Sequence, residues 1–343
     1  MNFDELGQVF AQFIGGQTGA SKVDVLDFSR LTGGAIQDNY ALTVLQHDGH
    51  NPGRKELVVR SDAPSQISAS LSRPQEFHVL NVAYEAGVTV PQPLWLCTDT
   101  SLIGAAFCIM SRVQGSASPR QLVRGGLTDG QAQALTHQLG TELARLHRVT
   151  PPRAELAFLH LPLINPALDR VQQYRNALAS IPEPHPALEW SLNWLQDHAP
   201  ESDPIVLCHC DFRTGNYMAQ NGQLTAVLDW EFATWSDPYE DLGWLCAKSW
   251  RFGANDREVG GVGHKQDLFK GYASQSGKSV DTNKVLYWEV MAMTRWAIIA
   301  LQQAQRHLSG EQSSLELALT GRMLPEIEFD LLNQIHALEK KHD

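Results

Sequence analysis

The sequence has few cysteines, a deficit of basic residues and no long apolar run, and each shortage excludes a class of protein. Five cysteines in 343 residues, an odd number placed in apolar stretches, argue against a disulfide framework and favour buried thiols in a reducing compartment. Lys and Arg number 27 against 38 Asp and Glu, so the formal charge is −11 and no nucleic-acid partner is expected.

The N-terminus has neither a basic region nor an apolar core, so it does not fit a secretory signal. The most apolar later stretch, residues 290–301, is interrupted by Arg295 and is too short to span a bilayer. We therefore expect a cytoplasmic protein without a membrane partner. Its hydrophobic fraction of 43% is enough for a sizeable core.

The order of sequence patterns predicts two domains, residues 1–113 and residues 114–343. The first reads as an antiparallel sheet with one helix, which begins at Ser72 with a capping box completed by Gln75. Strands are expected around residues 28–31, 40–46, 57–60, 94–97 and 105–113. The second is mainly helical, as the stripe of Leu135, Leu139 and Leu143 indicates. The fold class is therefore α+β.

The most informative segment is residues 208–231. His209, Asp211 and Asn216 fit the pattern H-x-D-x-x-x-x-N. In kinase catalytic loops the Asp of this pattern orients and deprotonates the acceptor hydroxyl, and the Asn binds a metal ion. Three matching positions by themselves would be weak evidence, so the surrounding chain matters.

That chain predicts a β-hairpin. Residues 217–220 and 223–228 are short strand-like runs joined by Asn221 and Gly222, a strong two-residue turn signal. If the hairpin closes there, Asn216 and Asp229 become diagonal neighbours, roughly 7–8 Å apart. Two oxygen-bearing side chains at that separation are suited to Mg²⁺ and a triphosphate.

With these residues in place, the chain resembles the aminoglycoside phosphotransferase/choline kinase family, from about residue 28 to the end. Residues 209–216 resemble its catalytic loop, Asp229 matches its metal-binding Asp, and residues 237–242 resemble its D-P-x-x-D-L segment. The likeness is strongest to the branch associated with acyl-CoA dehydrogenases. The resemblance implies a bilobal protein-kinase-like fold, with His209, Asp211 and Arg213 as catalytic residues and Asn216 and Asp229 as metal ligands.

The same resemblance assigns the nucleotide site to the first domain. Gly33 and Gly34 fall in the phosphate-covering loop, and Arg60 falls where kinases place the lysine that holds the α- and β-phosphates. Glu76 is the pairing carboxylate, and Ser111 and Val113 lie in the linker that contacts adenine. The implied cofactors are ATP, with GTP left open, and Mg²⁺. A plain ion pair between Arg60 and Glu76 is the alternative interpretation.

The acceptor site is expected after Asp241, where the chain offers cations and tryptophans rather than carboxylates: Trp244, Lys248, Trp250, Arg251, Trp288, Arg295 and Trp296. This favours a neutral or acidic hydroxylated small molecule, with a hydroxyacyl compound suggested by the branch. An aminoglycoside or choline-type kinase and a non-catalytic nucleotide-binding pseudokinase remain alternatives. A protein kinase is disfavoured because no A-P-E segment follows Asp229.

Overall fold

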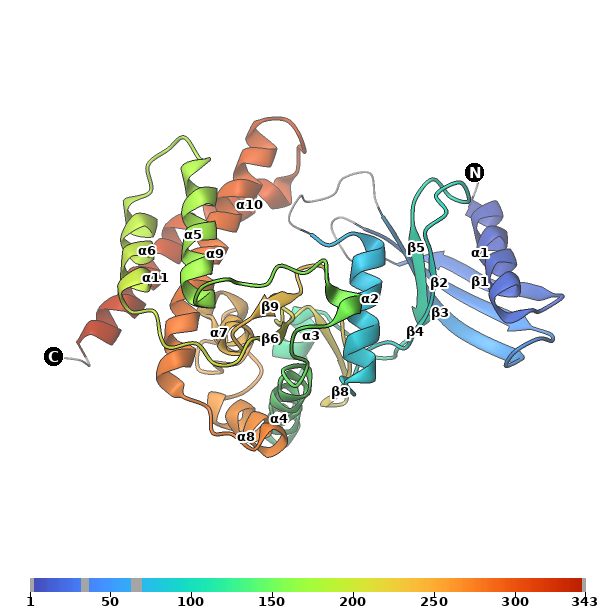
Figure 1. Ribbon diagram of the computed structural model, residues 1–343, viewed down its shortest axis with the longest axis horizontal. Helices are drawn as coiled ribbons and strands as arrows, with labels where there is room; N and C mark the ends of the chain where they lie inside the picture. Colours follow the sequence, from blue (N-terminus) through green and yellow to red (C-terminus); the bar gives the residue numbers. More distant parts are fainter. Residues whose placement is uncertain (1–2, 32–36, 63–69, 341–343) are drawn as a thin grey trace. The chain divides into compact units, whose positions relative to one another are not determined.

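The computed structural model describes residues 3–31, 37–62 and 70–340, and the chain divides into two compact units (Figure 1). Unit 1 comprises Met1–Gly115, Pro152–Phe158 and Thr225–Ala233. Unit 2 comprises Ser116–Pro151, Leu159–Leu224 and Thr234–Asp343. The predicted Gly33 and Gly34 lie outside the described residues.

Unit 1 is built on a five-stranded antiparallel sheet, as predicted. The strands lie in the order β1-β2-β3-β5-β4 and are β1 (Val23–Arg30), β2 (Gln37–Gln46), β3 (Gly53–Asp62), β4 (Pro93–Cys97) and β5 (Phe107–Ser111). Leu42 and Val44 of β2, Leu57 and Val59 of β3 and Phe107 and Ile109 of β5 stand at alternate positions of their strands and form a buried core. The period-two pattern of these strands dictates that burial.

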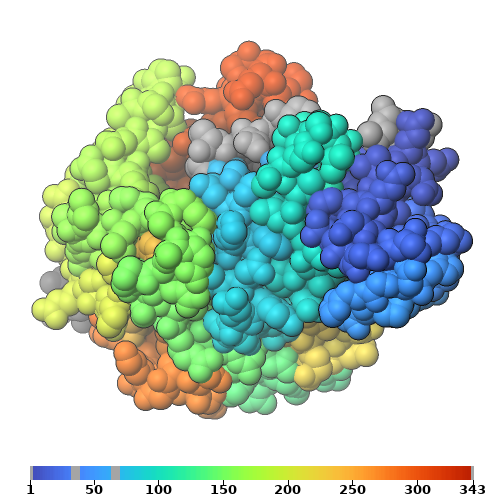
Figure 2. All heavy atoms as spheres, turned by 45° about the vertical axis from the view of Figure 1, so that its right-hand side comes forward, coloured from blue at the N-terminus to red at the C-terminus, as the bar shows by residue number. Residues whose placement is uncertain are grey.

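The prediction of one helix in this region was wrong, because two are present. The predicted helix is α2 (Arg73–Glu85), where Gln75 Oε1 accepts a hydrogen bond from the Ser72 amide at 3.0 Å. The helix that the sequence analysis missed is α1 (Phe3–Thr18). Its Phe10 and Ile14, one turn apart, are buried in the core of the sheet, and Figure 2 shows this dark-blue helix against the lighter-blue strands. The spacing of Phe10 and Ile14 was the sequence signal that could have predicted this helix.

Two later segments complete unit 1. The one-turn helix η1 (Ala154–Leu156) packs beside α2. Residues 225–233 are held by backbone bonds from Val227 N–H to Thr89 O at 2.8 Å and from Leu71 N–H to Glu231 O at 2.8 Å. These bonds fix Asp229 within unit 1 although it lies far along the chain from the sheet.

Unit 2 is mainly helical. Its helices are α3 (Pro119–Arg124), α4 (Asp129–Leu146), α5 (Pro166–Ala179), α6 (Pro186–Asp197), α7 (Tyr239–Cys246), η2 (Lys248–Trp250), α8 (Lys265–Ser276), α9 (Thr282–Leu308), α10 (Leu315–Arg322) and α11 (Leu324–Glu339). Helix α9 is central and contacts α6, α7, α10 and α11. No helix of the described residues has the combination of length and apolarity that a membrane crossing requires.

Short strands frame the loop that carries the catalytic pattern. Strand β6 (Val206–Cys208) pairs with β9 (Thr234–Ser236), and β7 (Tyr217–Gln220) pairs with β8 (Gln223–Val227). The predicted hairpin is confirmed: Asn221 and Gly222 join β7 and β8 with φ of 53° and 78°, as a type I′ turn requires. Asn216 and Asp229 belong to different units, so their predicted separation stays a prediction.

Helices α4 and α8 approach closely because both contribute glycine to their interface. A Cβ on Gly140 would lie 2.1 Å from the Leu268 carbonyl oxygen, and one on Gly271 would lie 1.9 Å from the His137 carbonyl oxygen. Real Cβ atoms do not come so near to backbone, so any larger residue must push the helices apart.

We expect Gly140→Ala to lower the free energy of unfolding by about 1–3 kcal/mol or more, the usual cost of overpacking. Urea denaturation followed by tryptophan fluorescence measures this. Gly130 lies on the same helix and a Cβ there would meet nothing within 4 Å. Gly130→Ala should therefore be neutral or stabilising by up to about 1 kcal/mol. Equal effects of the two substitutions would contradict this account of the α4–α8 contact.

Candidate active site

The catalytic loop between β6 and β7 is anchored on the buried carboxylate of Asp241. Its two oxygens accept the amide N–H groups of His209 at 2.8 Å and Cys210 at 2.7 Å. His147 Nε2 lies 3.2 Å from the same carboxylate. Burial by itself would raise the pKa of Asp241, but these hydrogen bonds and the neighbouring histidines hold it below the ordinary value. Asp241, which belongs to the D-P-x-x-D-L segment, therefore braces the loop.

The backbone conformation at Cys210 explains why a small residue suits this position. Its φ is 59°, a left-handed conformation that costs most residues free energy and glycine none. The Cys210 carbonyl oxygen also accepts a hydrogen bond from Arg295 Nη1 at 2.5 Å. The tight turn at Cys210 leads directly into Asp211.

Asp211 is 7% exposed, and its hydrogen-bonding partners among the described residues come from unit 2. Oδ1 accepts from Trp244 Nε1 at 2.9 Å and from Arg213 Nε at 3.1 Å. Oδ2 accepts from Asn216 Nδ2 at 2.5 Å, and the same nitrogen donates to the Asp211 carbonyl oxygen at 2.9 Å. The structure thus brings together three of the predicted site residues, Asp211, Arg213 and Asn216.

His209 lies on the buried side of the loop. Its side chain has no exposed surface, and its Nδ1 accepts the amide N–H of Asp211 at 3.2 Å. The ring also packs edge-on against Phe212. Arg213, by contrast, is partly exposed and places its guanidinium 4.8 Å from the centre of the Trp250 ring.

Unit 1 contains a network of buried and half-buried charges around Arg60. Arg60 Nη1 lies 3.1 Å from Glu76 Oε1, and its Nη2 donates to Asp229 Oδ1 at 3.0 Å. Glu76 also pairs with Arg73, which lies 3.4 Å from Asp62. Burial by itself would lower the pKa of Arg60, but the carboxylates of Glu76 and Asp229 raise it above its ordinary value. The predicted Arg60–Glu76 pair is therefore present.

The remaining predicted residues of unit 1 lie on β5 and just beyond it. Ser111 ends β5, and its amide donates to the Gln92 carbonyl oxygen at 2.9 Å. Within the described part of the chain, the Val113 amide donates to no backbone carbonyl. Asp229 has φ of 67° and a side chain 35% exposed, so a carboxylate oxygen remains accessible beside Arg60.

The residues expected to form the acceptor site have different surroundings in the structure. Trp288 is 1% exposed and belongs to the core. Lys248 pairs with Asp330, and Arg251 lies 3.8 Å from Glu289, so acidic groups compensate both cations. Trp244 contacts Asp211 directly. No local sequence signal singles out Trp244 from this set, because the hydrogen bond joins residues 33 positions apart.

Asp237 serves chiefly as a helix cap. Its Oδ1 accepts the amide of Tyr239 at 2.9 Å at the start of α7, and burial raises its pKa to about 6. Its carbonyl oxygen accepts the thiol of Cys208 at 3.4 Å. The Asp237 side chain thus caps α7, whereas its backbone carbonyl contacts Cys208 at the end of the strand before the catalytic loop.

A compact buried group of His147, Cys208 and Asp241 has metal-ligand composition, with ligand atoms within 4.8 Å of one another. Hydrogen bonds within the protein account for these atoms: His147 Nδ1 lies 3.0 Å from the Tyr272 hydroxyl, and the Cys208 thiol donates to Asp237. Burial raises the pKa of Cys208 well above its ordinary value, which disfavours the thiolate that zinc requires. The group is best explained as loop support.

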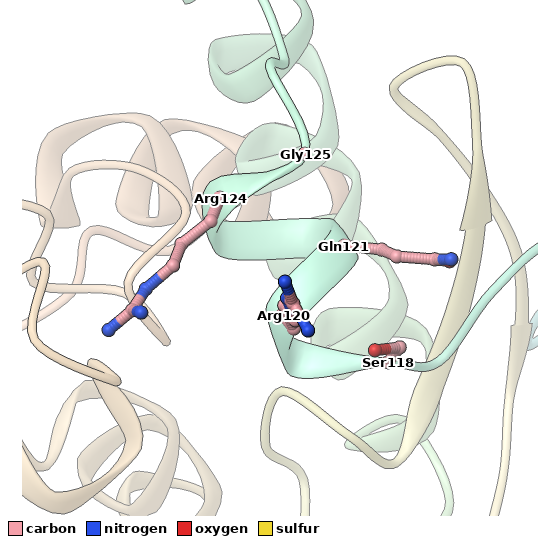
Figure 3. Close-up of a pocket in the computed structure, with 5 residues that line it drawn as sticks. All are labelled: Ser118, Arg120, Gln121, Arg124 and Gly125. Carbon is pink, nitrogen blue, oxygen red and sulfur yellow. The ribbon is translucent and has the colours of Figure 1, made fainter.

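A surface pocket of unit 2 lies beside the catalytic loop. A Cβ on Gly215 would lie 2.9 Å from Arg213 Nη1 and 3.7 Å from Pro119, so α3 adjoins Arg213. Figure 3 shows Arg124 and Gln121 leaving this helix in opposite directions. Arg124 Nη2 donates to the Phe252 carbonyl oxygen at 3.3 Å. The pocket lining has two cations and no carboxylate: Ser118, Arg120, Gln121, Arg124 and Gly125.

Comparisons with known proteins show which family this chain resembles. The model of the phosphotransferase enzyme family matches residues 27–274. Mouse acyl-CoA dehydrogenase family member 10 is 27% identical over 288 residues, which cover 78% of this chain and 26% of that protein. The chain therefore corresponds to about a quarter of the length of this relative.

Solved structures share the whole fold. A candidate aminoglycoside phosphotransferase from Ralstonia eutropha JMP134 matches with a TM-score of 0.75 and 21% identity, covering 95% of this chain and 97% of the other. A spectinomycin phosphotransferase in complex with ADP and spectinomycin matches with a TM-score of 0.61 and 15% identity, covering 95% and 98%. At these identities the likeness establishes the kinase-like fold, which confirms the predicted fold class.

Proposed function

Because the chain belongs to the phosphotransferase enzyme family, we propose that it transfers the γ-phosphate of ATP to a hydroxyl group of a small molecule. The observation that carries the proposal is Asp211, a largely buried carboxylate on a braced loop with Asn216 in direct contact. A nucleotide-binding protein without turnover has no need of such a base.

In the proposed reaction the acceptor oxygen attacks the γ-phosphorus while the bond to the β-phosphate oxygen breaks. The hydroxyl proton passes to Asp211, and the products are ADP and a phosphate monoester. His209 acts through position, because its ring holds the Asp211 amide. Arg213 lies near enough to Asp211 to neutralise charge on the transferring group.

Asn216 and Asp229 are the proposed ligands of Mg²⁺. Amide and carboxylate oxygens are the donors this ion prefers, so the residues present fit it. The Asn216 amide nitrogen is committed to Asp211, which leaves its oxygen for a cation. When bound, Mg²⁺ would neutralise charge on the triphosphate.

We assign the phosphate contact of the nucleotide to Arg60. A guanidinium can grip phosphate oxygens with two parallel hydrogen bonds, and the pair with Glu76 holds it in place. The Val113 amide, which donates to no backbone carbonyl of the described residues, supports adenine binding there, close to Ser111. Gly33 and Gly34 are proposed to cover the phosphates. GTP is an alternative nucleotide.

We expect Arg60→Met to weaken Mg·ATP binding at least tenfold, because a charge-assisted bond to phosphate contributes about 1.5–3 kcal/mol. Isothermal titration calorimetry measures the dissociation constant. Arg54 lies on the same strand with its side chain 65% exposed, so Arg54→Met is the matched control and should bind as wild type. Unchanged affinity for Mg·ATP in Arg60→Met would support the alternative that Arg60 and Glu76 form an ordinary ion pair without a role in nucleotide binding.

The acceptor is proposed to be neutral or acidic. Arg213 lies beside the catalytic carboxylate, and Arg120 and Arg124 line the neighbouring pocket, where a polycationic aminoglycoside would need carboxylates. The likeness to an acyl-CoA dehydrogenase family member adds a hydroxyacyl compound as the leading candidate.

The test is phosphate transfer from radiolabelled Mg·ATP to hydroxyacyl-CoAs, free hydroxy acids, aminoglycosides and choline. We expect turnover with one of the first two classes. Turnover with a cationic acceptor would support the aminoglycoside or choline-type alternative. Nucleotide binding without transfer to any acceptor would support a pseudokinase.

A further inference from the structure

The two carboxylate oxygens of Asp211 have different surroundings. Oδ1 accepts two hydrogen bonds, from Trp244 Nε1 at 2.9 Å and from Arg213 Nε at 3.1 Å. Within the part of the chain that the structure describes, Oδ2 accepts one, from Asn216 Nδ2. A carboxylate oxygen offers about two lone-pair positions, so Oδ1 is filled and Oδ2 is not.

We infer that Trp244 is a positioning residue for Asp211. The indole N–H of Trp244 holds Oδ1 of Asp211, which leaves Oδ2 to take the proton of the acceptor hydroxyl. The role of Oδ2 as proton acceptor rests on the proposed kinase function. The inference concerns a residue that the catalytic-loop pattern does not contain, supplied by α7.

Trp244 is the more rigid of the two donors to Oδ1. It is 3% exposed and packs against Trp250, with ring centres 5.1 Å apart. Its helix packs closely against α9, because a Cβ on Gly243 would lie 2.4 Å from Trp288. Arg213 has a long side chain that is 28% exposed. Arg213 can therefore move toward an acceptor while Trp244 keeps the carboxylate in one orientation.

Arg295 strengthens the indole as a donor. Its guanidinium carbon lies 4.4 Å from the centre of the Trp244 ring, and the same side chain donates to the Cys210 carbonyl oxygen. A cation over the ring draws electron density from the indole and makes its N–H a better donor. Arg295 thus stabilises the charge of Asp211 through the intervening tryptophan.

Asn216 does not obstruct Oδ2 permanently. Its amide nitrogen also donates to the Asp211 carbonyl oxygen at 2.9 Å. It can therefore release Oδ2 to an acceptor hydroxyl and still keep a partner in the loop. The Trp244 N–H has no comparable second acceptor among the contacts of the described residues, so its bond to Oδ1 persists.

The decisive variant is Trp244→Phe, which keeps an aromatic ring but removes the N–H. We expect kcat to fall roughly 10- to 100-fold, the range for a lost charge-assisted hydrogen bond, with KM for ATP unchanged. Trp194→Phe is the control, since Trp194 is 8% exposed in the same unit and its Nε1 has no partner within the described residues. It should retain the wild-type kcat.

A second measurement does not depend on turnover. In ¹⁵N–¹H spectra of the indole groups, Asp211→Asn should move one of the nine tryptophan signals upfield, because the acceptor loses its charge. In Trp244→Phe that signal should be missing.

Wild-type kcat in Trp244→Phe, or indole signals that do not move in Asp211→Asn, would overturn the inference. A fall in kcat equal to that of Trp194→Phe would also overturn it, because loss of packing would then explain both. If the wild type transfers phosphate to none of the acceptors, the proposed function fails, and the indole signals alone decide whether Trp244 holds Asp211.

Discussion

Asp211→Asn should reduce kcat about 10²- to 10⁴-fold, the contribution typical of a general base, while Mg·ATP binds as before. Asparagine keeps the shape of the side chain and can still accept the indole N–H of Trp244 at one oxygen. It cannot accept a proton from the acceptor. The proposed phosphate contact of Arg60 lies in unit 1 and is unaffected.

Steady-state kinetics with the acceptor found in the screen measures the fall in kcat, and calorimetry measures ATP affinity. Asp197→Asn is the control, since Asp197 is an exposed carboxylate at the end of α6. Turnover at the wild-type rate in Asp211→Asn would remove Asp211 as the base. A parallel loss of ATP affinity would assign it a role in nucleotide binding instead.

Asp241→Asn should lower the free energy of unfolding by about 3–5 kcal/mol, as removal of one buried charged partner does. The carboxylate is fully buried and accepts both the His209 and the Cys210 amides. An amide has only one acceptor oxygen, so its NH₂ group would face one of these donors. Urea denaturation of the variant and of Asp197→Asn measures the difference.

The pH dependence of this effect follows from the lowered pKa of Asp241. Because the folded protein holds the group ionised more strongly than the unfolded chain does, its contribution is fully present above the ordinary value of 3.8. It is lost as the pH falls from there through the lowered value. The stability gap between wild type and Asp241→Asn should therefore be constant near neutrality and narrow only in acid. A gap that narrows as the pH rises would contradict a lowered pKa.

The sequence by itself determined the local structure around the proposed site. The Asn221 and Gly222 turn closes β7 on β8 because those two residue types tolerate positive φ. The alternation of apolar residues formed the sheet of unit 1, and Ser72 with Gln75 began α2. The one-turn spacing of Phe10 and Ile14 would have revealed α1 as well. All these features depend on residues close together in the chain.

Only the tertiary structure decided which side chains meet. Trp244 reaches Asp211 across 33 residues, Arg295 reaches Cys210 across 85, and Arg60 reaches Asp229 across 169. No periodicity encodes such contacts, because each depends on how whole elements pack. The motif predicted Asp211 and Asn216, whereas packing decided which oxygen of Asp211 is held and which is left for a proton. The physical reason is that backbone preferences are local, but the surroundings of a buried charge come from distant parts of the chain.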